Sequence, residues 1–148
     1  MFKSIHHSGI VVSDMAKSEK FYCNVLGMQV AERRERIGGA INSVVGYKET
    51  HIECVDLYFG EGHLIELIQY HIPEPKDRPT DERSYLGASH IAFLVEDIHS
   101  TYQKLIDNGA HSMNPPIEVA PGKSVVTFRI LMVTGLSLLN FLDRNEFF

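Results

Sequence analysis

The chain has 148 residues, 44% of them hydrophobic, with 14 Lys and Arg against 19 Asp and Glu and a net charge of −5. This length and composition are typical of one compact domain with a hydrophobic core, and the negative charge argues against nucleic-acid binding. Two cysteines are too few for a disulfide framework, and no stretch is apolar for the roughly 18 residues of a transmembrane helix, so we expect a cytoplasmic protein.

The chain begins with a predicted strand and helix. "HHSGIVV", at residues 6–12, is rich in β-branched residues and predicts a strand. Asp14 can then cap a helix by accepting hydrogen bonds from free backbone N–H groups. We expect that helix over 14–26, because its apolar residues fall mostly on one stripe, and Gly27 suits the left-handed conformation that often ends a helix.

The rest of the first half is mainly strand-like. We expect strands over 28–37, 51–59 and 63–70, with a hairpin at Gly60-Glu61-Gly62 and a loop over 37–50. The run "ERRER" at 32–36 mixes both charges, and we interpret it as a solvated face.

The second half repeats the first. His90 lies 83 residues after His7, as Asp97 does after Asp14. We expect a helix over 97–108 that ends at Gly109, and strands over 111–119, 123–130 and 136–142. The order is therefore β-α-β-β-β, twice. A segment rich in proline and charge joins the halves, so we expect one domain with module one at 1–72, a linker at 73–87 and module two at 88–148.

Three segments, "HHSGIVVSDMAKSEKFYCNVLGM", "GEGHLIELIQ" and "GASHIAFLVEDIHSTYQKLIDNGA", resemble the vicinal oxygen chelate superfamily. Its members include glyoxalase I, methylmalonyl-CoA epimerase, extradiol dioxygenases and the fosfomycin and bleomycin resistance proteins. The resemblance covers nearly the whole chain. It implies an α+β fold in which two tandem βαβββ modules form one curved mixed sheet around a metal-binding cleft. It also implies a small-molecule substrate and a homodimer, with no nucleic-acid or membrane partner.

The resemblance implies that His7, Glu66 and His90 bind a divalent metal ion, which could be Zn, Co, Ni, Mn or Fe. The residues themselves favour a special role for Glu66, which lies within the apolar run "LIELI". A buried carboxylate is costly unless it is paired or binds a metal, so we expect it to meet a cation or base. His6 should point to the opposite face of the strand from His7.

The fourth ligand of the family, a glutamate on the last strand, is missing. "FRILMVTGLSLLNFLD", at 128–143, has no acidic residue before its end, and alignment places Ser137 at that position, with Asn140 as an alternative after a one-residue slip. Read one base earlier, the codons of this stretch can encode Asp-Pro-Asp-Gly-Asn-Gly-Leu-Glu-Leu-Ile-Glu, with its first Glu at position 137. We therefore hypothesise that one base was lost near codon 130.

We favour a metal-dependent lyase or isomerase of the glyoxalase or methylmalonyl-CoA epimerase type, acting on a thiohemiacetal or thioester. In such enzymes the metal stabilises negative charge on a carbonyl oxygen while a carboxylate removes the proton on the neighbouring carbon. Glu53 resembles an epimerase base in its placement, although strand alternation equally allows a solvent-facing residue. The alternative is a non-enzymatic drug-binding protein of this fold. An extradiol dioxygenase is less expected, because it needs the missing glutamate.

Overall fold

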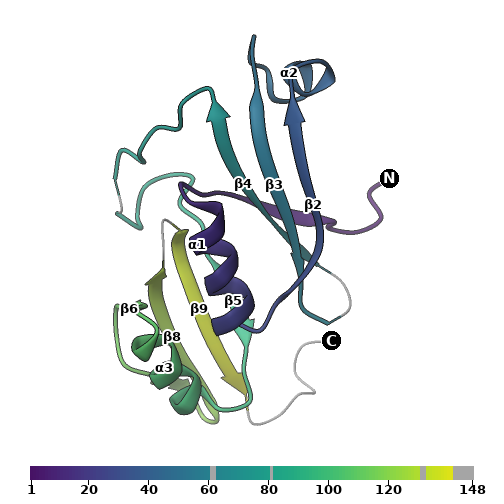
Figure 1. The fold of residues 1–148 in the computed structure, drawn as a ribbon. Coiled ribbons are helices and arrows are strands. Elements are labelled where there is room, and N and C mark those ends of the chain that lie inside the picture. The colour runs from purple at the N-terminus through teal and green to yellow at the C-terminus, as the bar shows by residue number, and fades with distance from the viewer. Residues whose placement is uncertain (61–62, 81, 131–132, 142–148) are drawn as a thin grey trace. The chain divides into compact units, whose positions relative to one another are not determined.

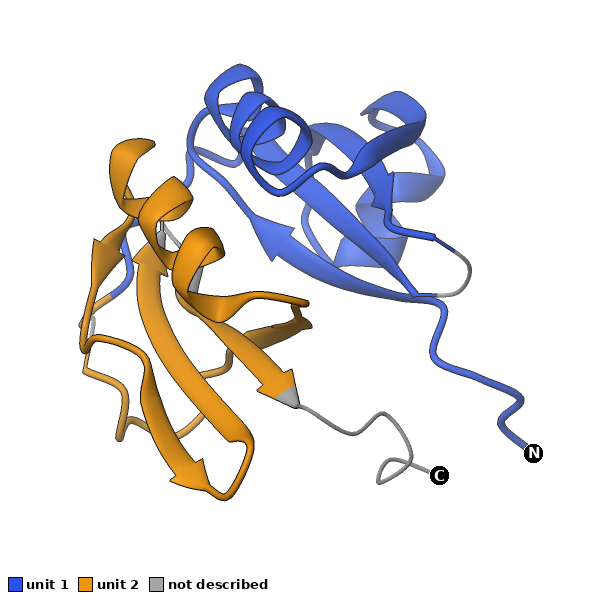
Figure 2. Ribbon diagram, turned by 90° about the horizontal axis from the view of Figure 1, so that it is seen from below, with its two compact units in different colours: residues 1–78 blue, residues 79–148 orange. Residues whose placement is uncertain are grey.

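A computed structural model describes residues 1–60, 63–80, 82–130 and 133–141 (Figure 1). The chain divides into two compact units, residues 1–78 and 79–148 (Figure 2). The boundary between them lies within the segment predicted as a linker. The grouping of both modules into one domain stays a prediction. No helix among the described residues is long and apolar enough to cross a membrane.

The first unit forms a four-stranded sheet in the order β1-β4-β3-β2. Its elements in chain order are β1 (His7–Val11), α1 (Met15–Lys20), the π-helical turn η1 (Phe21–Val25), β2 (Gln29–Ile37), α2 (Ala40–Val45), β3 (His51–Tyr58) and β4 (Leu64–Ile72). Strand β1 runs parallel to β4, and the other pairs are antiparallel. The predicted strands and helix are confirmed to within a few residues, whereas α2 was expected to be loop.

Local chemistry places α1 on one face of this sheet. The Asp14 carboxylate accepts a hydrogen bond from the backbone N–H of Lys17 at 2.9 Å, as predicted for a helix cap. The side-chain oxygen of Gln69, on β4, accepts from the backbone N–H of Met15 at 2.6 Å, which ties the helix start to the sheet. Gly27 has a φ of 82° and follows the helical segment in the left-handed conformation. Fully buried residues form the core of this unit, among them Val12, Tyr22, Val55, Leu57 and Leu67.

The second unit repeats this arrangement. It contains β5 (Ile91–Leu94), α3 (Ile98–Asp107), β6 (His111–Ser112), β7 (Ile117–Ala120), β8 (Lys123–Ile130) and β9 (Val133–Phe141). The sheet order is β5-β9-β8-β6, with β7 also paired to β8 and with β5 parallel to β9. The strand expected over 111–119 is interrupted, because the sequence there includes Pro115-Pro116 and proline cannot donate to a ladder. Asp97 caps α3 through the N–H groups of His99 and Ser100.

The strand registers show which positions of the two modules correspond. Gly9 of β1 lies opposite Glu66 of β4, and Ala92 of β5 lies opposite Ser137 of β9. Ser137 is therefore the counterpart of Glu66 within the repeat. The α+β class, with two βαβββ modules of mixed sheet, is confirmed.

Candidate metal centre

His7 and Glu66 lie on the face of the first sheet that points away from α1. Successive residues of a strand alternate between faces, and Leu67 and Gln69 of β4 belong to the face that α1 covers. Glu66 therefore belongs to the opposite face. The imidazole Nε2 of His7 is 3.5 Å from Oε2 of Glu66, so two residues distant in sequence meet across neighbouring parallel strands.

The spacing of this pair fits two ligands of one metal ion. Nitrogen and oxygen ligands about 2.1 Å from a tetrahedral ion lie about 3.4 Å apart, close to the observed separation. The expectation that His6 points to the opposite face was wrong: His6 precedes β1, and its Nδ1 is 2.8 Å from Nδ1 of His7, which leaves Nε2 as the His7 nitrogen that faces Glu66. A Cβ on Gly9 would lie 3.9 Å from Oε2, so glycine leaves room beside that oxygen. Within the described ranges, no three His, Cys, Asp or Glu side chains already form a metal-binding group.

Arg34 holds the other oxygen of Glu66, and the sequence interpretation of this arginine was wrong. "ERRER" was expected to be a solvated face, yet the Arg34 side chain is only 19% exposed. Its Nη2 donates to Oε1 of Glu66 at 2.8 Å, and both terminal nitrogens donate to the Asp56 carboxylate, at 2.6 and 2.8 Å. The expectation that Glu66 meets a cation or base is confirmed, because its carboxylate contacts both the Arg34 guanidinium and the His7 imidazole. Alternation along β2 could have indicated that some of these charges face inward.

Electrostatics on this face keep the arginine charged and the nearby thiol protonated. Hydrogen bonds, chiefly to Asp56, raise the pKa of Arg34. Burial, and then the negative charge of Glu66, raise the pKa of Cys54 to about 11. Cys54 is therefore a thiol at neutral pH, which argues against a cysteine nucleophile here.

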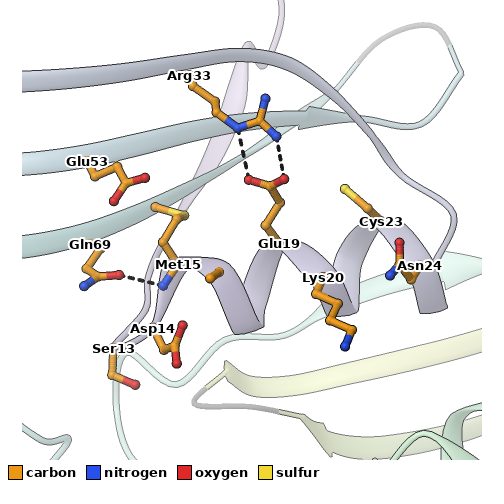
Figure 3. Close-up of a pocket in the computed structure, with 11 residues that line it drawn as sticks. Ser13, Asp14, Met15, Glu19, Lys20, Cys23, Asn24, Arg33, Glu53 and Gln69 are labelled. Carbon is orange, nitrogen blue, oxygen red and sulfur yellow. Dashed lines mark hydrogen bonds and ion pairs between the residues drawn. The ribbon is translucent and has the colours of Figure 1, made fainter.

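Glu53 lies on the opposite face from Glu66. It pairs in register with Gln69, and its carboxylate is 3.8 Å from Nε2 of His71. It lines a cavity of about 800 Å³ between α1 and the sheet, together with Asp14, Arg33 and other residues. Figure 3 shows this cavity with the ion pair between Arg33 and Glu19, whose closest contact is 2.5 Å. The structure thus separates Glu53 from the His7–Glu66 pair by the thickness of the sheet.

In the second unit, His90 and Ser137 also share a face. His90 directly precedes β5, and a Cβ on Gly135 would lie 3.1 Å from the Cβ of His90. Ser137 is buried, and its hydroxyl is 3.4 Å from that of Thr127 on β8. Asn140, the alternative fourth ligand, instead donates through Nδ2 to the backbone carbonyls of Val95 and Glu96. That contact gives Asn140 a structural role.

Comparison with known proteins identifies the family. Residues 4–135 match the Glyoxalase/Bleomycin resistance protein/Dioxygenase superfamily, and the chain belongs to it. It is 33% identical over 123 residues to an uncharacterized protein of Bacillus subtilis, YwkD, and 32% identical over 125 residues to a probable lactoylglutathione lyase of Synechocystis, covering 82% of each chain in both cases. A glyoxalase family protein of Bacillus cereus has the same fold, with a TM-score of 0.89, 21% identity and 97% of both chains covered.

Proposed function

We propose that this protein is a metal-dependent lyase or isomerase that removes a proton from the carbon beside a carbonyl group. The observation that carries the proposal is the His7–Glu66 pair, whose 3.5 Å separation suits adjacent ligands of a divalent ion. The relative named as a probable lactoylglutathione lyase supports the lyase reaction. The substrate class we propose is a thiohemiacetal or a CoA thioester, as in glyoxalase I or methylmalonyl-CoA epimerase.

The residues have distinct roles in this proposal. His7 and Glu66 would hold the ion together with His90, and of the expected metals Zn, Co, Ni and Fe suit this set of two imidazoles and one carboxylate better than Mn, which prefers oxygen ligands. When bound, the ion supplies Lewis-acid stabilisation of negative charge on the substrate oxygen. Glu53 lies on the other face of the sheet, so a base at the His7–Glu66 pair has to be another residue. Because Ser137 lacks a carboxylate, we expect turnover to be slow compared with a relative that has glutamate there.

Metal analysis of the purified protein tests the proposal. We expect near-stoichiometric divalent metal in the wild type and a large loss in Glu66→Ala and in His7→Ala. Glu53→Ala is the matched control, since it removes a carboxylate from the opposite sheet face and should leave the metal content unchanged. Unchanged metal in Glu66→Ala would contradict the site. Exchange of the substrate's carbon-bound proton with deuterated solvent then measures the reaction.

The absence of a carboxylate at Ser137 favours a second candidate, a non-enzymatic small-molecule binder of the same fold. Tight ligand binding by protein that contains no metal and shows no proton exchange would support this alternative. In either case we propose a homodimer, the commonest closed assembly of identical chains, which sedimentation velocity tests.

A further inference from the structure

Arg34 lies at the centre of a cluster of carboxylates on the same face as His7. Its guanidinium contacts Asp56 through two nitrogens and Glu66 through one, and Glu32 lies 2.6 Å from Nη1. Asp56 and Glu66 lie directly opposite each other in register on β3 and β4. Their side chains are 10% and 17% exposed, so water screens them poorly.

The two carboxylates together carry four oxygens, and Arg34 engages three of them. It takes both oxygens of Asp56 and Oε1 of Glu66. The remaining oxygen, Oε2 of Glu66, is the one that faces Nε2 of His7. Two adjacent carboxylates without the arginine would form an oxygen-rich anionic group, which is the chemistry that Ca²⁺ and Mn²⁺ prefer.

We propose that Arg34 determines which metal ions this face accepts. Its fixed positive charge occupies the Asp56–Glu66 pair and excludes ions that need many oxygen ligands. It leaves one carboxylate oxygen beside one imidazole nitrogen, a mixed pair that suits Zn²⁺, Co²⁺ or Ni²⁺. The claim that a metal binds at His7 and Glu66 rests on the proposed function, whereas the exclusion of Ca²⁺ and Mn²⁺ depends only on the contacts of Arg34.

Calorimetric titration of Arg34→Met with Ca²⁺ and with Mn²⁺ tests the inference. We expect this variant to bind both ions at least about tenfold more tightly than the wild type, because a positive charge is removed from two poorly screened carboxylates. Arg33→Met is the matched control: Arg33 is the neighbouring residue on β2 but pairs with Glu19 on the α1 side. The gain should be absent in Arg33→Met and should disappear in the double variant Arg34→Met/Asp56→Asn.

The outcomes separate this inference from the proposed function. If Arg34→Met binds Ca²⁺ and Mn²⁺ no better than Arg34→Met/Asp56→Asn, the inference is wrong, even where Ni²⁺ binding to the wild type depends on His7. If the wild type binds no transition metal but Arg34→Met gains Ca²⁺, the proposed function fails and the role of Arg34 stands. Should Arg34→Met not fold, Arg34→Gln replaces it. Glutamine also removes the positive charge, so a folded Arg34→Gln with no gain over the wild type also overturns the inference.

Discussion

Gly135 provides a quantitative test of how His90 is held, because the two residues are in close contact. In Gly135→Ala the new Cβ would lie 3.1 Å from the Cβ of His90 and 3.9 Å from its Cα. Neither atom is the end of a flexible chain, so the strand or the histidine has to shift. Overpacking of this kind costs about 1–3 kcal/mol. Replacing a glycine in an unstrained conformation also gains about 0.4–1 kcal/mol through the unfolded state.

The cost of overpacking exceeds the gain from the unfolded state, so we expect the free energy of unfolding to fall by about 1–2 kcal/mol. For a chain of this size that loss lowers the melting temperature by roughly 2–8 °C. Gly9→Ala is the contrasting control, because its nearest contact is the terminal Cδ1 of Ile68 at 3.3 Å, which can move aside. We expect Gly9→Ala to melt within about 2 °C of the wild type.

Thermal melts of the two variants in chelator measure stability alone, and NMR of the His90 ring reports its displacement. In Gly135→Ala we expect both a lower melting temperature and a shifted His90 resonance. An unchanged melting temperature together with an unchanged His90 resonance would show that β9 does not approach the histidine as described, and our placement of His90 would be wrong.

Three further predictions concern other sites. Ser137→Glu should raise affinity for Zn²⁺ or Ni²⁺ about tenfold or more over Ser137→Ala in calorimetry, because it places a carboxylate at the counterpart of Glu66. Hydrogen bonds from Ser100 and His99 lower the pKa of Asp97 in the folded protein. The stability that the Asp97 carboxylate provides is therefore fully present above the unfolded-state pKa of about 3.9 and is lost as the pH falls through the lower folded-state pKa. The difference in melting temperature between wild type and Asp97→Ala should close in that acidic range. Cys54, with its pKa near 11, should resist iodoacetamide at pH 8 in folded protein and react after unfolding, as mass spectrometry can measure.

The sequence predicted those parts of the fold that depend on local chemistry. The strand over 123–130 and the caps at Asp14 and Asp97 follow from alternation and from short-range hydrogen bonding, and the structure confirms them. Helix α2 was missed because it is only 6 residues long and lies between Gly39 and Gly46, so it is too short for helical periodicity to be distinguished from loop.

The ion cluster around Arg34 could not be predicted in the same way. Its partners, Asp56 and Glu66, lie on two other strands, and their meeting depends on the register of β2 against β3 and of β3 against β4. Both ladders contain a register shift, and the one between Val30 and Glu32 in β2 changes which charged residues face inward. Sequence periodicity alone does not locate such a shift. The mixed-charge run therefore looks solvent-exposed in the sequence, although Arg34 within it is a largely buried partner of Asp56 and Glu66.

The contrast between the two modules bears on the hypothesis that one base was lost near codon 130. Where module one has Glu66 opposite Asp56, module two has Ser137 opposite Thr127, so the backbone repeats while the charges do not. Strand β9 pairs with β5 and with β8 in the frame as written, because backbone hydrogen bonds make the pairing and do not require a particular side chain at position 137. The nucleotide sequence of the gene therefore decides whether a base was lost. Glutamate at 137 in the shifted frame requires a Leu136 codon ending in G and a Ser137 codon beginning with AG. A Ser137 codon of the TCN type rules out the lost base, and the serine then belongs to this protein's own site.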